Sequence, residues 1–340
     1  MNTEDTLRAT IAELTRPGRG ILAADESQPT ITKRFGALGI ESTEETRRAY
    51  RTMLFTAPGA DEYLSGVILF EETLTQCDDA GTPLPEVLRR RGVLPGIKVD
   101  KGTTPLPNAA GDLITQGLDG LVERLRAYGS HGIRFAKWRE VYGIGARNPT
   151  PLGVAANAEV LARYAAICQQ EGIVPIVEPE VLIDGDHSLP RCHEVTEAVL
   201  HAVFDALERH GVLLEGIVLK PSMVVPGNKH ASRATAAQVA NATLTVLRRT
   251  VPAAVPTINF LSGGQTPEAA TANLNAMNVE TPRAPWVLSF SYARALQDPA
   301  MHAWGGRAEN VGAAQAAFAH RVRMNSLARD GRWTPAMENA

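Results

Sequence analysis

A lysine stands at the end of an apolar run in residues 213–221, LLEGIVLKP, and Pro221 closes that run. Burial at such a position would remove water from the amine and disfavour its charged form. A neutral lysine amine attacks carbonyl carbons and forms Schiff bases. Lys220 could instead only end a strand and extend its amine into solvent, so the rest of the chain has to decide between the two interpretations.

Charged residues also end most of the other apolar runs. Successive side chains on a strand point to opposite faces, so residues at i and i+2 share a face. Three such pairs occur: Lys98 with Asp100, Lys137 with Arg139, and Glu178 with Glu180. If the runs are neighbouring strands of one closed sheet, these pairs converge on a small polar cavity. Burying so many ionisable groups is costly unless they are used, and this favours the catalytic interpretation of Lys220.

The residue types then predict roles. Lys220 would be the nucleophile that condenses with a ketone, and Lys137, as a nearby like charge, would lower its pKa further. Glu178 or Glu180 would supply and take protons while the carbinolamine dehydrates. Asp25 is a separately placed carboxylate, suited to general-base work at another carbon. The resulting iminium is an electron sink, so a carbon–carbon bond beside the former ketone can break without a metal or cofactor.

Two groups of residues predict phosphate binding. The turn Ser262-Gly263-Gly264 offers backbone N–H groups to an anion, although such a turn is often merely flexible. Ser291 and Arg294, after the last apolar run, would complete this site. The second group follows the first run and consists of Ser27, Thr30, Lys33 and Arg34. Alone it would fit an exposed helix face; together the two groups indicate a substrate phosphorylated at both ends and bound partly by arginine.

The elements that must position these residues are eight short apolar runs separated by helical stretches. The runs lie at 20–26, 66–72, 95–101, 132–139, 173–180, 215–221, 256–264 and 285–292, and clear amphipathic helices at 156–171, 189–210 and 232–249. This alternation predicts an α/β protein with a single (β/α)8 TIM barrel, whose functional groups gather at the carboxyl ends of the strands. A doubly wound sheet is the alternative, but no GxGxxG or Walker motif follows a run. We expect one domain over residues 1–329, with an N-terminal helix at 4–15, and a short polar tail at 330–340.

The composition excludes several classes of protein. Of the 340 residues 44% are hydrophobic and 21% charged, and the net charge of −3 argues against nucleic acid or an anionic membrane as partner. No apolar run approaches the roughly 20 residues that span a bilayer. Three scattered cysteines indicate reduced thiols in the cytoplasm. His187, in DGDHSLPRC, lies beside two aspartates, but no metal-ligand spacing accompanies it, and we expect no metal.

With these residues assembled, the chain resembles the class I fructose-1,6-bisphosphate aldolases from about residue 4 to residue 335. The motifs that carry the resemblance are GRGILAADES (18–27), GVILFEETL (66–74), GIKVDKG (96–102), FAKWR (135–139), IVPIVEPE (173–180), DGDHSLPRC (184–192), LEGIVLKPSMVVPG (214–227), FLSGGQ (260–265), FSYARAL (290–296) and AWGG (303–306). The resemblance implies a TIM barrel assembled as a homotetramer. It implies reversible cleavage of fructose 1,6-bisphosphate to dihydroxyacetone phosphate and glyceraldehyde 3-phosphate, in glycolysis and gluconeogenesis.

Matched motif by motif, the resemblance makes Lys220 the Schiff-base lysine and Glu178 the acid and base of the imine steps. Asp25 would act on the C4 hydroxyl, with Lys137 and Lys98 as active-site cations. The C1 phosphate would be held by Ser262, Gly263, Gly264, Ser291 and Arg294, and the other phosphate by Ser27, Thr30 and Arg34. Arg139 is expected to contact the substrate, and Glu180 to be a structural partner of Lys137 or Arg139.

Three positions depart from the family pattern. Ala293 replaces a glycine of the phosphate loop, and Thr30 stands where serine is common. Animal members carry a terminal tyrosine that assists proton exchange at C1, whereas the last tyrosine here is Tyr292. We expect Glu178 or a water to take that role. The choice among fructose 1,6-bisphosphate, fructose 1-phosphate and sedoheptulose 1,7-bisphosphate stays open, as do a catalytically silent sugar-phosphate-binding barrel or scaffold and pyridoxal-phosphate chemistry on Lys220.

Overall fold

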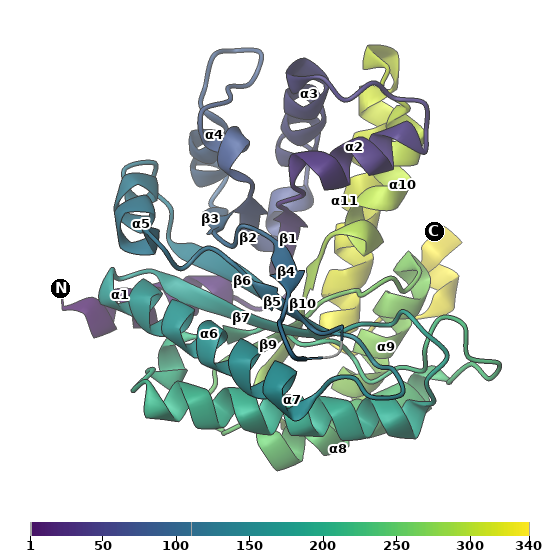
Figure 1. Cartoon of the computed structure of the whole chain (residues 1–340). Helices are drawn as coiled ribbons and strands as arrows, with labels where there is room; N and C mark the ends of the chain where they lie inside the picture. Colours follow the sequence, from purple (N-terminus) through teal and green to yellow (C-terminus); the bar gives the residue numbers. More distant parts are fainter. Residues whose placement is uncertain (1, 110, 340) are drawn as a thin grey trace.

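Parallel strands form the centre of the structure, a computed structural model that describes residues 2–109 and 111–339. Within those residues eight strands form a closed barrel, and each overlaps one of the predicted runs: β1 (Gly20–Ala24), β2 (Leu64–Leu69), β3 (Leu94–Lys98), β6 (Phe135–Tyr142), β7 (Val174–Val181), β8 (Val218–Leu219), β9 (Thr257–Phe260) and β10 (Val287–Tyr292). Their order around the barrel is β1-β10-β9-β8-β7-β6-β3-β2, and Figure 1 shows these strands in the centre of the molecule with helices around them. The predicted (β/α)8 barrel is therefore confirmed.

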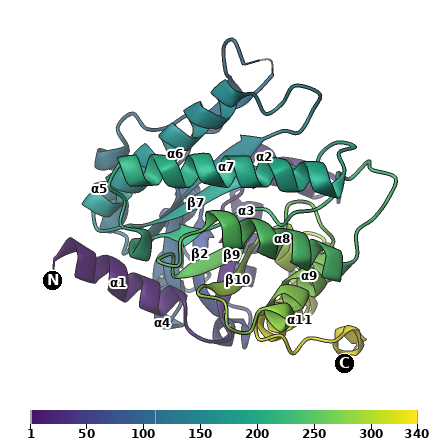
Figure 2. The same cartoon turned by 90° about the horizontal axis from the view of Figure 1, so that it is seen from below.

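Helices surround the barrel: α1 (Thr3–Leu14), α2 (Gln28–Gly36), α3 (Glu44–Phe55), α4 (Leu84–Arg90), α5 (Leu121–Gly129), α6 (Pro151–Gln170), α7 (Leu189–Arg209), α8 (Ala236–Thr250), α9 (Pro267–Glu280), α10 (Arg294–Trp304) and α11 (Val311–Arg329). Helices α6 to α9 pack side by side in chain order (Figure 2). A small antiparallel hairpin, β4 (Thr103–Pro105) and β5 (Leu113–Thr115), precedes α5. The sequence analysis did not predict this hairpin. No helix in the described chain is long and apolar enough to cross a membrane.

Two of the predicted helices begin elsewhere because of their N-caps. Helix α6 begins at Pro151, five residues before the predicted start, because the hydroxyl of Thr150 accepts the N–H of Gly153. Helix α8 begins at Ala236 and not at 232, because Thr235 and Gln238 form a capping box. The helix ends agree better with the prediction. Gly172 and Gly211 follow α6 and α7 with φ of 71° and 62°, the left-handed conformation that ends helices.

An apolar cluster fills the amino-terminal half of the barrel lumen. Inward-facing residues of six strands belong to it, and Leu7, Ile11 and Leu14 of α1 pack against them, so α1 closes this end of the barrel. The ring of Phe135 has room there because β3 carries Gly96: a Cβ at Gly96 would overlap that ring. The lumen is therefore open only at the carboxyl ends of the strands.

The chain after α11 folds back onto the helices. Glu338 forms an ion pair with the buried guanidinium of Arg321 and accepts a hydrogen bond from Trp333 Nε1 at 2.9 Å. The backbone N–H of Trp333 donates to Asn275 of α9 at 3.0 Å. Segment 331–339 is thus held against α9 and α11.

Candidate active site

Four buried ionisable side chains lie in, or directly after, four barrel strands. Each lies two residues beyond an apolar member of the lumen cluster, and therefore on the same face of its strand. The pairs are Ala23 and Asp25, Phe135 and Lys137, Ile176 and Glu178, and Val218 and Lys220. The lumen thus changes from apolar to charged within one strand period. For this reason the four charged side chains meet next to the apolar cluster that fills the other half of the lumen.

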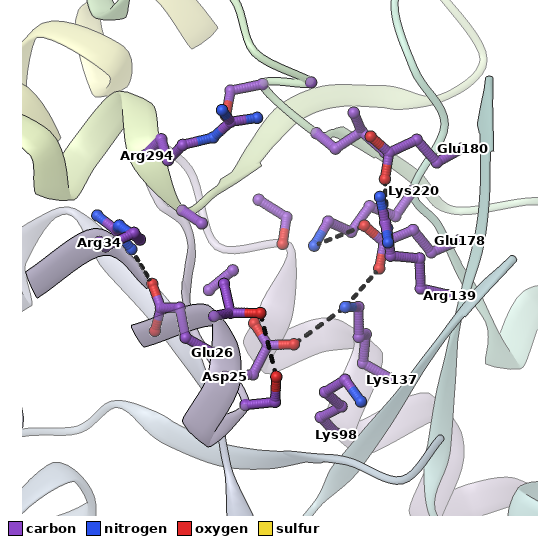
Figure 3. A pocket seen from close by; sticks show the side chains of 18 of the residues that line it. Asp25, Glu26, Arg34, Lys98, Lys137, Arg139, Glu178, Glu180, Lys220 and Arg294 are labelled. Atoms are coloured by element: carbon purple, nitrogen blue, oxygen red, sulfur yellow. Dashed lines mark hydrogen bonds and ion pairs between the residues drawn. The ribbon is translucent and has the colours of Figure 1, made fainter. Parts of the chain in front are cut away.

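The four groups form a continuous chain of ion pairs (Figure 3). Lys137 Nζ lies 2.9 Å from Asp25 Oδ2 and 2.9 Å from Glu178 Oε2, and Lys220 Nζ lies 3.3 Å from Glu178 Oε1. Each of the four side chains is at most 9% exposed. Although Oε2 of Glu178 lies near Lys137, it accepts no hydrogen bond within the described residues. Glu178 is therefore in contact with both lysines and retains a free lone pair.

Burial and neighbouring charges shift the pKa values of the two lysines, Lys220 and Lys137, in opposite directions. Burial lowers the pKa of Lys220, and the like charge of Lys137 lowers it further, against the opposing effect of Glu178. For Lys137, burial is outweighed by the carboxylates of Asp25 and Glu178, and its pKa is raised. Burial would raise the pKa of Asp25, but Lys137 and Lys220 reverse the effect and lower it. Of the two amines Lys220 is thus the one that more readily becomes neutral, and it lies beside the cation of Lys137 and 3.3 Å from Glu178.

These groups lie in a cavity of about 540 Å³ at the carboxyl ends of the strands. The cavity brings together nearly all the residues that the sequence analysis selected: Asp25, Ser27, Thr30, Arg34, Lys98, Lys137, Arg139, Glu178, Lys220, Ser262, Gly263, Ser291 and Arg294. Gly264 is not among the lining residues. It lies directly behind them, since a Cβ there would be 3.4 Å from Arg294 Nη2.

One side of the cavity has the features of an anion site. Gly263 and Gly264 have φ of 53° and 85°, left-handed conformations that suit glycine. Arg294 is exposed and begins α10, whose amino-terminal dipole favours negative charge. The buried hydroxyl of Ser291 has no partner within the described chain. Ala293 has φ of −99°, so this position does not require the glycine that it replaces.

A second candidate anion site lies at the start of α2. The hydroxyls of Ser27 and Thr30 are 3.1 Å apart and line the cavity together with Lys33 and Arg34. Other side chains already form polar contacts with the guanidinium of Arg34. One of them, Glu26, pairs with it (Figure 3) and also lines the cavity. Glu26 lies inside the GILAADE run but was not predicted, because strand alternation places it on the face opposite Asp25. It still lines the cavity, since β1 ends at Ala24.

Two further ion pairs include residues that line the cavity, namely Lys98, Arg139 and Glu180. Lys98 Nζ donates to Asp100 Oδ1 at 2.6 Å, and Arg139 pairs with Glu180. Glu178, and not Glu180, is therefore the carboxylate beside Lys220. Glu180 is the partner of Arg139, one of the two partners expected for it.

Comparisons with known proteins agree over almost the whole chain. The family model described as "Fructose-bisphosphate aldolase class-I" (Glycolytic) matches residues 6–340. "Fructose-bisphosphate aldolase 6, cytosolic" of Arabidopsis thaliana is 55% identical over 327 residues, which are 96% of this chain and 91% of that protein. "Fructose-bisphosphate aldolase C" of Mus musculus is 54% identical over 318 residues, 93% of this chain and 88% of that protein.

A solved structure shows the same likeness in three dimensions. The Plasmodium falciparum fructose-bisphosphate aldolase, crystallised with TRAP and a small-molecule inhibitor, has a TM-score of 0.96 at 48% sequence identity. The match covers 98% of this chain and 96% of that one. Family model, relatives and structure agree, and we conclude that the chain belongs to the class I fructose-bisphosphate aldolases.

Proposed function

We propose that Lys220 forms the Schiff base through which this protein carries out the reaction of its family. As a class I fructose-bisphosphate aldolase the protein is a lyase of glycolysis that reversibly cleaves fructose 1,6-bisphosphate. The observation that carries the residue assignment is the contact of a buried lysine of lowered pKa with a carboxylate, 3.3 Å away, that also touches a second lysine. This combination supports a neutral nucleophile beside a proton carrier.

The steps follow from these positions. Glu178 takes a proton from Lys220, the neutral amine attacks the C2 ketone, and Glu178 returns the proton with which the carbinolamine oxygen leaves as water. Asp25 removes the proton of the C4 hydroxyl, and the C3–C4 bond breaks. Its electron pair moves into the iminium and gives an enamine, while C4 leaves as the aldehyde of glyceraldehyde 3-phosphate. The proton held by Asp25 then returns to solvent, and a proton from solvent reaches C3 of the enamine through Glu178. Hydrolysis of the imine releases dihydroxyacetone phosphate and restores Lys220.

The two carboxylates have separate tasks because Lys137 lies between them. Its amine contacts both, which keeps their negative charges apart and keeps Asp25 ionised as a base. The hydroxyl of Tyr292 is buried and donates to the carbonyl of Ala270, so it takes no part in protonating the enamine. We assign that protonation, at C3, to Glu178, whose Oε2 accepts no hydrogen bond within the described residues.

We assign the C1 phosphate to the site of Ser262, Gly263, Gly264, Ser291 and Arg294, and the C6 phosphate to Ser27, Thr30 and Arg34. Lys98 and Arg139 form the wall between these ends and are assigned to the sugar hydroxyls. An arginine and a helix amino-terminus at each end support this arrangement.

Borohydride trapping with dihydroxyacetone phosphate in EDTA, followed by peptide mass spectrometry, tests the proposal. We expect one reduced adduct, on Lys220, and none in the Lys220→Met variant. A folded wild-type protein that binds the ligand without forming an adduct would instead support a silent sugar-phosphate-binding barrel. Absorbance of the untreated protein near 400 nm, roughly where an internal aldimine is expected, would support pyridoxal-phosphate chemistry.

Location and assembly are also proposals. Relatives from Arabidopsis thaliana and Spinacia oleracea are named cytosolic or cytoplasmic isozymes, which supports a cytoplasmic location for this chain. The family resemblance supports a homotetramer. Light scattering coupled to size-exclusion chromatography tests it, and a mass near 36.5 kDa would contradict it.

A further inference from the structure

The guanidinium of Arg34 is held by three acceptors, two of them carboxylates. Nη1 donates to Glu26 and to Gln297 Oε1, and Nη2 donates to Asp298 Oδ1 at 2.8 Å. Burial would lower the pKa of Arg34, but Glu26 and Asp298 outweigh it and raise this pKa. One positive charge thus faces two negative charges at the end of the cavity that we assign to the C6 phosphate.

The other phosphate end is different. Arg294 is exposed and has no carboxylate within 4.0 Å among the described residues, so its charge is fully available to an anion. A phosphate that approaches Arg34 must instead displace Asp298 or share the guanidinium with it. Each phosphate site has one arginine, but only the charge of Arg34 is already compensated by carboxylates. The site at Arg34 should therefore bind a phosphate more weakly than the site at Arg294.

Asp298 is held in place by the residue before it. Gln297 is fully buried, accepts a hydrogen bond from Tyr50 at 3.0 Å and donates to the carbonyl of Ala23 in β1. These bonds fix α10 against the barrel and against α3. Asp298 itself is 36% exposed and does not line the cavity, so it reaches the substrate only through Arg34.

We propose that Asp298 is a specificity-determining residue that weakens the binding of a second phosphate by competing for Arg34. The proposal rests on the assignment of Arg34 to the C6 phosphate in the proposed function. It predicts that Asp298 reduces the preference for ketose bisphosphates over ketose 1-phosphates. Fructose 1-phosphate has no phosphate at this end, so its cleavage is independent of Asp298.

Steady-state cleavage of fructose 1,6-bisphosphate and fructose 1-phosphate by wild type and Asp298→Asn tests this. We expect the KM for the bisphosphate to fall about two- to fivefold, the range for a partly exposed ion pair. We expect kcat/KM for fructose 1-phosphate to stay within about twofold of wild type. Glu309→Gln removes the same charge from an exposed residue paired with Arg307, outside the cavity, and should change neither value.

The Arg34→Ala background shows whether the effect passes through this arginine. There, Asp298→Asn should no longer change the KM for the bisphosphate. An unchanged or higher KM in the single variant, an equal shift for both substrates, or a persistent effect without Arg34 would each overturn the proposal. Failure of the proposed function is distinguishable, because wild type would then cleave neither substrate.

Discussion

Lys137 Nζ donates a 2.9 Å hydrogen bond to Asp25 Oδ2, across a sequence separation of 112 residues. Both side chains are almost fully buried, and the same amine also lies 2.9 Å from Glu178. One cation therefore compensates two carboxylates that would otherwise repel each other in a buried site, where water screens charges poorly. We therefore infer that Lys137 acts by its positive charge and not by donating a proton.

Replacing Lys137 by methionine should leave Asp25 without its ion-pair partner and raise its proton affinity, while Glu178 keeps only its contact with Lys220. We expect kcat for fructose 1,6-bisphosphate to fall by about 10²–10⁴, the range typical of lost acid–base catalysis. Lys101→Met is the matched control, because Lys101 is half exposed and pairs with Glu71 outside the cavity. Wild-type kcat in Lys137→Met would contradict this role.

The Asp25→Asn variant should separate the two halves of the reaction. Imine formation with dihydroxyacetone phosphate needs Lys220 and Glu178 but no base at C4. We therefore expect borohydride to trap the adduct on Lys220 as in wild type, while cleavage falls by about 10²-fold or more. Loss of the adduct together with cleavage would show that Asp25 acts on Lys220 and not on the C4 hydroxyl.

A buried glutamate outside the cavity makes the stability depend on pH. Glu140 of β6 is fully buried; its Oε1 accepts from Trp138 Nε1 at 2.7 Å, and its Oε2 has no partner within the described chain. Burial raises the pKa of this carboxyl from 4.5 to about 8. Because the folded state binds this proton more tightly than the unfolded state, the free energy of unfolding falls as pH rises from 4.5 to about 8.

Glu140→Gln removes the proton and should flatten this dependence. Relative to wild type, we expect the variant to gain about 3–5 kcal/mol of stability between pH 5 and pH 8.5, at about 1.4 kcal/mol per pKa unit. Tm values measured at both pH values check this, with Glu309→Gln as a surface control. Parallel Tm curves for wild type and Glu140→Gln would disprove the assignment.

The close approach of Phe135 to β3 predicts a packing effect. Gly96→Ala should destabilise the protein by about 1–3 kcal/mol, because the added methyl group meets the Phe135 ring in a filled lumen. Gly312→Ala, where a Cβ meets nothing within 4 Å, should not destabilise it. Adding Phe135→Leu to Gly96→Ala should restore part of the loss in denaturant unfolding. Additive losses would contradict this packing explanation.

Much of the site could be predicted because it follows strand periodicity. Asp25, Lys137, Glu178 and Lys220 each follow an apolar residue by two positions, and a closed barrel brings the ends of such strands together. That relation is local in sequence and needs no knowledge of side-chain contacts. The positions of the strands could be predicted for the same reason. The predicted helix starts were less accurate, because capping residues such as Thr235 set where a helix begins.

The partners of Arg34 could not be predicted in this way. Asp298 lies 264 residues further along the chain, in α10. The sequence of that helix shows that position 298 is polar but does not indicate which residue it contacts. Such a contact depends on how α2 and α10 meet, which no local period encodes. The hairpin of β4 and β5 was missed because three-residue strands are too short to show alternation.

Closure of the barrel has a consequence for synthesis of the chain. β1 pairs with β10, and the hydroxyl of Ser289 donates to the carbonyl of Arg19, 270 residues earlier. Translation adds roughly 5–20 residues per second. The edge of β1 that pairs with β10 therefore stays unpaired for roughly 15–55 s while the rest of the chain is synthesised. An unpaired strand edge is a template for association with other chains. The nascent protein is therefore most prone to aggregation until its last strand emerges, and truncation before β10 would make that state permanent.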